Sequence, residues 1–261
     1  MSAMPLLECF VRGEVDPEVA MLAAQGALAP RADEQLAILV HLVTHDETQV
    51  ATVAGQTIAA LPVEAVAGLL ARPDASDKVL QFFAARGITP GSVATEDVEA
   101  PLVDTGDEGE PAAEAEAEAE AAEPAKRVPL NAMTVPQRLK RAMKGTREER
   151  AVLVRDPNRM IAAAVLSSPK LTATEVEAFA RMGNVSEETL RTIAMNRTWM
   201  RKVTVAQALV KNPKTPPAIS LHLLPRMNQR DIKHLSTDRN VPEALRLNAK
   251  KMMQKQADRQ K

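Results

Sequence analysis

The sequence predicts an all-α protein made of two short helical-repeat modules with an acidic linker between them. Aromatic residues form only 2% of the 261 residues, whereas large β-sandwiches and barrels normally use more aromatic and β-branched side chains. Amphipathic segments recur outside the linker, with apolar side chains at helical spacing such as Leu36, Leu39 and Val43. Proline turns separate these segments at intervals of 43 to 44 residues, which indicates repeated helical units.

Local signals place the ends of several helices. Asp16 before Pro17 is typical of an N-cap followed by a proline in the first turn. Thr146 with Glu149 predicts a capping box, in which the hydroxyl accepts the amide three residues on and the carboxylate returns to the cap amide. Thr172 and its glutamate three residues on repeat this pattern. Glycines stand where helices are expected to stop, at Gly13, Gly87, Gly145 and Gly183.

The near-neutral total charge of −1 hides two strong opposite charges. Residues 1–88 carry 5 basic and 11 acidic side chains, a net charge of −6. Residues 89–125 carry 12 acidic side chains and no basic one. Residues 126–261 carry 28 basic and 11 acidic side chains, a net charge of +17. The basic half is therefore expected to meet anionic partners.

We predict three parts: an acidic helical-repeat module over 1–88, a disordered linker over 89–130 and a basic helical-repeat module over 131–261. The linker is rich in Pro, Gly, Ala and Glu, and it has too few large apolar groups to offset the entropy of ordering. Its centre, Glu114–Ala122, alternates Glu and Ala, so like charges stand four residues apart. We expect this tract to fold back over the basic module at low salt and to compete with anionic partners.

The proline turns predict how the modules are built. The turn at Pro30 matches the turn at Pro73, 43 residues on, and the turn at Pro169 matches the turn at Pro213, 44 residues on. A period of this length lies in the HEAT and armadillo range, with two or three helices per unit. Such units bury their apolar faces on their neighbours and build an extended binding surface.

The segment Val210–Pro217 contains an Asn-Pro-x-Thr-Pro turn that resembles the turn of the bacterial leucine-rich-variant repeats. Residues 132–254 as a whole resemble a bacterial HEAT-like helical-repeat family without assigned activity. The resemblance is carried by Ile161–Thr172, Asn184–Arg191, Leu209–Pro216 and Asp238–Arg246. It implies a helical-repeat fold and implies no chemistry.

Few residues suggest catalysis. His41 and His45 lie one helical turn apart, but the glutamate that a metalloprotease motif needs after its first histidine is absent. Ser167 and Lys170 have the serine–lysine spacing of penicillin-recognising enzymes, without the other motifs of that class. The single cysteine, Cys9, excludes an intrachain disulfide. We therefore expect a protein that is not an enzyme and that uses no metal and no cofactor.

The strongest sign of a binding site is the run from Arg197 to Lys202, which places the only Trp among three cations. The candidate anion-binding or partner-binding residues are Arg181, Arg191, Arg197, Trp199, Arg201, Lys202, Lys211 and Lys214. One interpretation is that Trp199 packs between repeats while the cations are solvated. The other is that these residues form an anion-binding face with a stacking or cation–π element.

The sequence favours a non-enzymatic scaffold or adaptor that binds protein partners. The alternative is a protein that binds nucleic acid or another polyanion through residues 126–261 and is regulated by the acidic linker. An enzyme acting on DNA would need an acid beside Trp199, for which Asp156 and Asp238 are available. No run of 18 apolar residues exists, and the N-terminus lacks a basic leader, so we expect no membrane span and a cytoplasmic location.

Overall fold

The structure, a computed structural model, describes residues 4–28, 30–92, 94, 100–104 and 129–259. Within these residues the chain forms sixteen α-helices, two 3₁₀-helices and no strand, which confirms the predicted all-α class. The chain divides into two compact units, residues 4–171 and residues 172–261.

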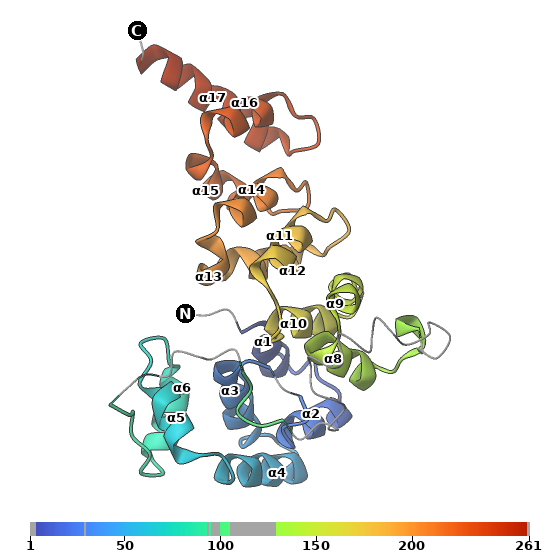
Figure 1. The fold of residues 1–261 in the computed structure, drawn as a ribbon, viewed down its shortest axis with the longest axis vertical. Helices are drawn as coiled ribbons and strands as arrows, with labels where there is room; N and C mark the ends of the chain where they lie inside the picture. The colour runs from blue at the N-terminus through green and yellow to red at the C-terminus, as the bar shows by residue number, and fades with distance from the viewer. Residues whose placement is uncertain (1–3, 29, 93, 95–99, 105–128, 260–261) are drawn as a thin grey trace. The chain divides into compact units, whose positions relative to one another are not determined.

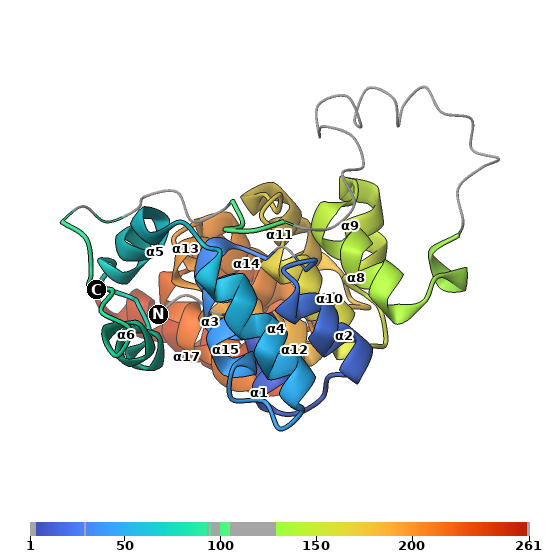
Figure 2. The ribbon, with the colours of Figure 1, turned by 90° about the horizontal axis from the view of Figure 1, so that it is seen from below.

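The first unit contains α1 to α6, a 3₁₀-helix η2, and α8 to α10. Their bounds are α1 Pro5–Val11, α2 Pro17–Ala24, α3 Ala32–Leu42, α4 Thr48–Ala59, α5 Val63–Leu70, α6 Asp77–Ala84, η2 Leu130–Ala132, α8 Val135–Lys144, α9 Arg147–Leu153 and α10 Arg159–Ser167. Helix α4 packs across α2 and α3, α8 packs against α9 and α10, and α1 lies between α3 and α10 (Figures 1 and 2). The fully buried Leu6, Leu39, Leu139 and Ile161 bring apolar side chains from four of these helices into the interior.

Helix α10 belongs to the first unit because backbone and side-chain contacts join it to the start of α3. The Arg31 guanidinium donates to the Leu166 carbonyl at 2.5 Å, and the Arg31 N–H donates to the Ser167 carbonyl at 3.3 Å. These bonds occupy carbonyls at the carboxyl end of α10, which have no partner within their own helix. The sequence predicts residues 131–171 as part of the basic C-terminal module, whereas the structure includes them in the first unit.

Part of the predicted linker, residues 89–130, packs on the first unit. The side chain of Gln35 is buried, and its Oε1 accepts from Leu102 N–H at 2.7 Å and from Val103 N–H at 3.0 Å. Its Nε2 donates to the Val103 carbonyl at 2.5 Å. Gly26 has a φ of +74° and lies against the Val103 side chain, so any β-carbon at that position would collide with it. One buried amide therefore fixes a segment that composition alone assigned to a linker.

The docked segment also carries an ion pair to a helix far along the chain. Lys144, the last residue of α8, places its Nζ 2.5 Å from a carboxylate oxygen of Asp104. The acidic Glu114–Ala122 tract lies in residues 105–128, outside the described residues, so its disorder and its fold-back stay predictions.

The second unit contains α11 to α17 and a 3₁₀-helix η3. Their bounds are α11 Ala173–Arg181, α12 Glu187–Met195, α13 Arg197–Met200, α14 Val203–Lys211, α15 Pro217–Leu223, η3 Leu224–Arg226, α16 Gln229–Thr237 and α17 Glu243–Arg259. Helices α11 and α14 pack together, as do α16 and α17. In Figure 1, α13 and α15 lie on one side of this unit, and the turns that follow α11, α14 and α16 lie on the other.

The predicted helix starts are present in both units. The hydroxyl of Thr146 accepts from Glu149 N–H and that carboxylate accepts from Thr146 N–H, which forms the predicted capping box of α9. Thr172 and Glu175 form the same reciprocal pair at α11. Asp16 is the N-cap of α2, as predicted, but its side chain makes no capping hydrogen bond.

Two turns that match in sequence use similar polar contacts, each inside its own unit. Ser168 Oγ donates to the Met143 carbonyl at 2.7 Å. Forty-four residues on, Asn212 Nδ2 donates to the carbonyls of Ala180 and Met182 at 2.8 and 3.0 Å. Both side chains are buried, so each satisfies carbonyls near the end of an earlier helix. Each of the two turns is therefore held by a buried polar side chain that bonds back to an earlier helix.

Candidate interaction surface

One edge of the second unit gathers exposed cations and exposed apolar side chains around the short helix α13. We call it the α13 edge and define it by Met195, Arg197, Arg201, Lys202, Val203 and Arg226. Met195 ends α12, Arg197 begins α13, and Val203 begins α14, so most of the edge comes from one corner of the chain. All six side chains are exposed.

The corner forms because Asn196 ends one helix and starts the next. Its side-chain Oδ1 accepts from Thr198 N–H at 2.9 Å and from Trp199 N–H at 3.3 Å, as an N-cap does. The side chain is only 1% exposed, and among the described residues its Nδ2 has no hydrogen-bond partner. A buried donor without an acceptor lowers stability by about 1–3 kcal/mol.

Two of the charges of the edge, those of Arg197 and Arg201, lie on one helical face. Arg201 N–H donates to the Arg197 carbonyl, so the two arginines stand one turn apart in continuous helical backbone. Like charges at this spacing are destabilising by a few tenths of a kcal/mol. Among the described residues, no acidic side chain pairs with Arg197, Arg201 or Lys202. The edge therefore keeps a concentrated positive charge that the unit itself does not neutralise.

Some other cations of the same unit are neutralised by an acid on their own helix. Arg181 pairs with Glu177 and Arg191 pairs with Glu187, in each case with the acid one turn earlier on the same helix. Both pairs have the order that stabilises a helix, with Glu on the N-terminal side. At the corresponding position before Arg201 stands a second arginine.

Arg226 adds a fourth cation to this edge, and it is not among the residues that the sequence predicts for a binding site. Its Nη2 donates to the Met200 carbonyl at 2.7 Å, which joins η3 to α13. The residue lies in a different helix from the run at Arg197, and no motif surrounds it. The relation depends on the fold, in which α15, the helix directly before η3, lies on the same side of the unit as α13 (Figure 1).

Two of the most exposed large apolar side chains flank the cations. Met195 is 65% exposed and Val203 is 55% exposed. Single exposed apolar residues are ordinary on protein surfaces, but here they stand on both sides of the basic run in sequence. The edge thus combines charge with apolar contact area, as protein-binding surfaces do.

Trp199 does not contribute to the surface, because its side chain is only 6% exposed and α13 turns it inward. A ring in this position is not available to stack on a base or to cover a ligand cation. The structure therefore favours the first of the two interpretations of Trp199, a packing residue with solvated cations around it.

The remaining predicted site residues lie elsewhere. Lys211 pairs with Asp231 at 2.9 Å, and Lys214 is exposed in the turn after α14. That turn lies on the side of the unit opposite to α13 (Figure 1). Of the eight predicted residues, the structure brings Arg197, Arg201 and Lys202 together at one exposed edge.

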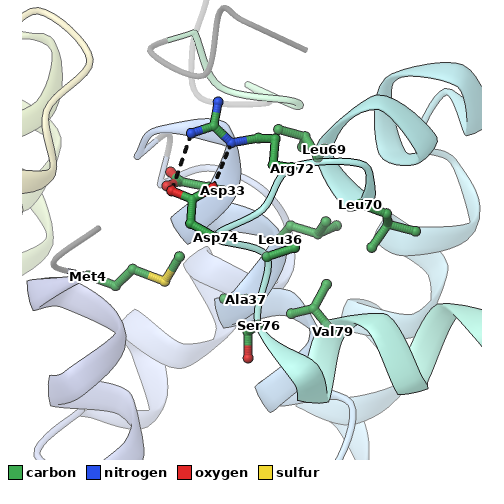
Figure 3. Close-up of a pocket in the computed structure, with 11 residues that line it drawn as sticks. Met4, Asp33, Leu36, Ala37, Leu69, Leu70, Arg72, Asp74, Ser76 and Val79 are labelled. Atoms are coloured by element: carbon green, nitrogen blue, oxygen red, sulfur yellow. Dashed lines mark hydrogen bonds and ion pairs between the residues drawn. The ribbon is translucent and has the colours of Figure 1, made fainter. Parts of the chain in front are cut away.

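The first unit has a small pocket between α3 and α6 (Figure 3). On its polar side Arg72 holds Asp74 in a two-pronged ion pair, with 3.1 Å from Nε to Oδ1 and 3.3 Å from Nη2 to Oδ2. Burial raises the pKa of the neighbouring Asp33, although the N–H of Glu34 and nearby arginines oppose the shift. The apolar wall is formed by Leu36, Ala37, Leu69, Leu70 and Val79. The arginine already has a carboxylate partner, so we assign this pocket to helix packing.

A buried carboxylate joins three helices of the first unit. Glu34 lies in α3, and its Oε1 accepts from Leu6 N–H at 2.7 Å and from Leu7 N–H at 3.1 Å at the start of α1. Ser167 of α10 lies beside the carboxyl, close enough to favour its charged form but without the geometry of a formed hydrogen bond. Burial dominates and raises the pKa of Glu34 to about 7, against the opposing effects of Ser167, the Leu7 N–H and Arg31.

The structure places the two residues of the serine–lysine spacing in different surroundings. Ser167 is fully buried beside Glu34, whereas Lys170 Nζ donates to the Lys144 carbonyl at 3.2 Å. His45 accepts from Glu47 N–H at its own helix end. In the described part of the chain, no group of three His, Cys, Asp or Glu side chains is placed to hold a metal ion.

Comparison with family models, with curated proteins and with solved structures finds no match for this chain. Among the helices that the structure describes, none is by itself both long and apolar enough to cross a membrane.

Proposed function

We propose that the protein is a non-enzymatic helical-repeat scaffold that binds another protein through the α13 edge. The observation that carries this proposal is the set of exposed cations at Arg197, Arg201 and Lys202, which have no acidic partner among the described residues. Exposed charge of one sign steers and orients an oppositely charged partner. The flanking Met195 and Val203 supply apolar surface that a partner would remove from water.

The repeat interpretation supports the same proposal. The matching contacts at Ser168 and Asn212 are consistent with helical units that recur along the chain. Proteins built this way commonly use their outer edges and faces for binding. The resemblance of residues 132–254 to a helical-repeat family without assigned activity agrees with a binding role.

The second candidate is a protein that binds nucleic acid or another polyanion. It is favoured by the charge of the second unit, where residues 172–261 carry 17 basic and 8 acidic side chains, a net charge of +9. The burial of Trp199 counts against it, because single-stranded nucleic acid is normally held by exposed aromatic rings. In this second candidate function, the acidic linker regulates binding by competing with the anionic partner.

The experiment is affinity capture with the full chain, with and without nuclease treatment of the extract. A second bait carries Arg197→Glu, Arg201→Glu and Lys202→Glu. We expect a protein that survives nuclease treatment with the unaltered bait and is lost with the altered one. Loss of all bound protein after nuclease would instead support the nucleic-acid candidate, and equal capture by both baits would contradict the role of the α13 edge.

A further inference from the structure

The α13 edge also indicates which kind of partner would fit it. We infer that it accepts an acidic segment of a partner protein, in which two carboxylates one turn or two extended residues apart are flanked by aliphatic side chains. This inference rests on the proposed function and adds the chemistry of the partner.

The first step is the spacing of the charges. Arg197 and Arg201 are four residues apart in helical backbone, a rise of about 6 Å. Carboxylates at i and i+4 of a helix have the same rise, and carboxylates at i and i+2 of an extended chain are about 7 Å apart. Each guanidinium can hold one carboxylate with two parallel hydrogen bonds. Lys202 adds a third cation beside them, with no fixed geometry to satisfy.

The second step is the apolar flanks. Met195 is exposed two residues before the basic run and Val203 is exposed directly after it, so a ligand that follows the run would meet an apolar side chain at each end. Methionine is flexible and adapts to irregular aliphatic surfaces. A phosphate backbone presents charge without aliphatic groups, so it would leave both side chains in water. Aliphatic residues beside the acids of a peptide would cover Met195 and Val203. This favours a peptide over nucleic acid as the ligand.

The third step is that this corner combines a like-charged pair with a buried amide that lacks an acceptor, although the buried hydroxyls of Thr215 and Ser220 in the same unit also lack partners among the described residues. The like-charged pair Arg197 and Arg201 replaces the Glu–Arg pairs found in α11 and α12. Beneath it, the buried Asn196 amide lacks an acceptor among the described residues. Local departures of this kind tend to concentrate at functional sites.

The test uses fluorescein-labelled probes and the full chain in a fluorescence anisotropy titration. Probe one is a 12-residue peptide with a Glu-x-x-x-Glu core flanked by leucines. Probe two has the same acids with the leucines replaced by serines, and probe three is a 12-base-pair DNA duplex. We expect probe one to bind most tightly, by about fivefold or more over probe two, since apolar burial adds to charge.

The variants locate the binding. Arg197→Glu, Arg201→Glu and Lys202→Glu together should weaken probe one by about tenfold or more. The matched control reverses three exposed lysines of α17, with Lys250→Glu, Lys251→Glu and Lys255→Glu, and changes the net charge equally. We expect the control to change the affinity by less than about threefold. Met195→Ser with Val203→Ser should reduce the affinity for probe one to that for probe two.

Three results would overturn the inference. Equal weakening by both triple variants would show a response to net charge alone. Equal binding of probes one and two, or tighter binding of the duplex, would show that aliphatic contact plays no part. No binding of probe one would exclude this partner chemistry, while capture of a nuclease-resistant protein by the full chain would still support the scaffold. The two proposals can therefore fail separately.

Discussion

Glu34 and Leu6, 28 residues apart in sequence, are joined by a buried hydrogen bond of 2.7 Å from the Leu6 N–H to the Glu34 Oε1. The carboxyl is 2% exposed, and no cation pairs with it among the described residues. It therefore fixes the start of α1 to α3 while its own ionisation is opposed by burial.

This relation predicts a pH-dependent stability. The pKa of Glu34 rises from 4.5 to about 7 on folding, so the stabilisation that it contributes is complete below pH 4.5 and is lost as the pH rises through about 7. From this group alone, the free energy of unfolding should fall by about 3 kcal/mol between pH 4.5 and pH 8. Urea unfolding of the full chain across that range measures the change.

Glu34→Gln keeps an oxygen for Leu6 and Leu7 but removes the ionisation, so we expect it to flatten the pH dependence. Glu64→Gln, at an exposed position of α5, serves as the control and should leave the slope unchanged. Identical slopes for the unaltered protein and Glu34→Gln would contradict this account of the junction.

The burial of Trp199 predicts a large effect on stability. Trp199→Ala should lower the free energy of unfolding by about 3–5 kcal/mol, because it leaves a cavity where the ring packs. The fluorescence of Trp199 should be blue-shifted and poorly quenched by iodide. Met195→Ala, at a 65% exposed position of the same corner, should change stability by less than about 0.5 kcal/mol. A red-shifted and readily quenched Trp199 would place the ring on the surface instead.

The contacts of Asn212 predict that one side chain ties two turns of the second unit together. Asn212→Ala removes the donor to the Ala180 and Met182 carbonyls, and we expect a loss of about 2–3 kcal/mol in chemical unfolding. Asn240→Ala, in an exposed turn, should cost less than about 1 kcal/mol. Equal effects of the two substitutions would remove the buried contact as the explanation.

The hydrogen bonds of Gln35 predict that the segment around Leu102 is protected from proteolysis. Gln35→Ala removes all the hydrogen bonds that the side chain makes to Leu102 and Val103, so thermolysin should gain a cleavage site there under native conditions. The exposed Gln56→Ala should leave the digestion pattern unchanged. Rapid cleavage at Leu102 in the unaltered protein would contradict the docking.

The helical class and several helix starts could be predicted because they depend on local patterns. Apolar spacing, the proline turns and the capping residues Thr146 and Thr172 act within a few residues, and the structure shows both capping boxes. The docking of residues 102–103 could not be predicted, because it depends on Gln35, a buried amide whose partners are 67 and 68 residues away. Composition predicts a linker, but it cannot show that the distant side chain of Gln35 both accepts hydrogen bonds from this segment and donates one to it.

The candidate site was predicted only in part for the same reason. The run from Arg197 to Lys202 is contiguous, so it is visible in the sequence. The pairing of Arg181, Arg191 and Lys211 with acids was not foreseen, and Arg226 was missed because it reaches α13 from another helix. Whether a cation is free or neutralised depends on which side chains the fold places beside it.

The most direct test of the account is hydrogen–deuterium exchange of the full chain with and without saturating acidic–leucine peptide. If the α13 edge is the binding surface, amides of residues 195–204 and 223–227 should exchange more slowly in the complex. The turns at residues 182–186 and 212–216, on the other side of the unit, should keep their exchange rates. Protection centred on those turns, or no change at residues 195–204 under saturation, would contradict the central claim.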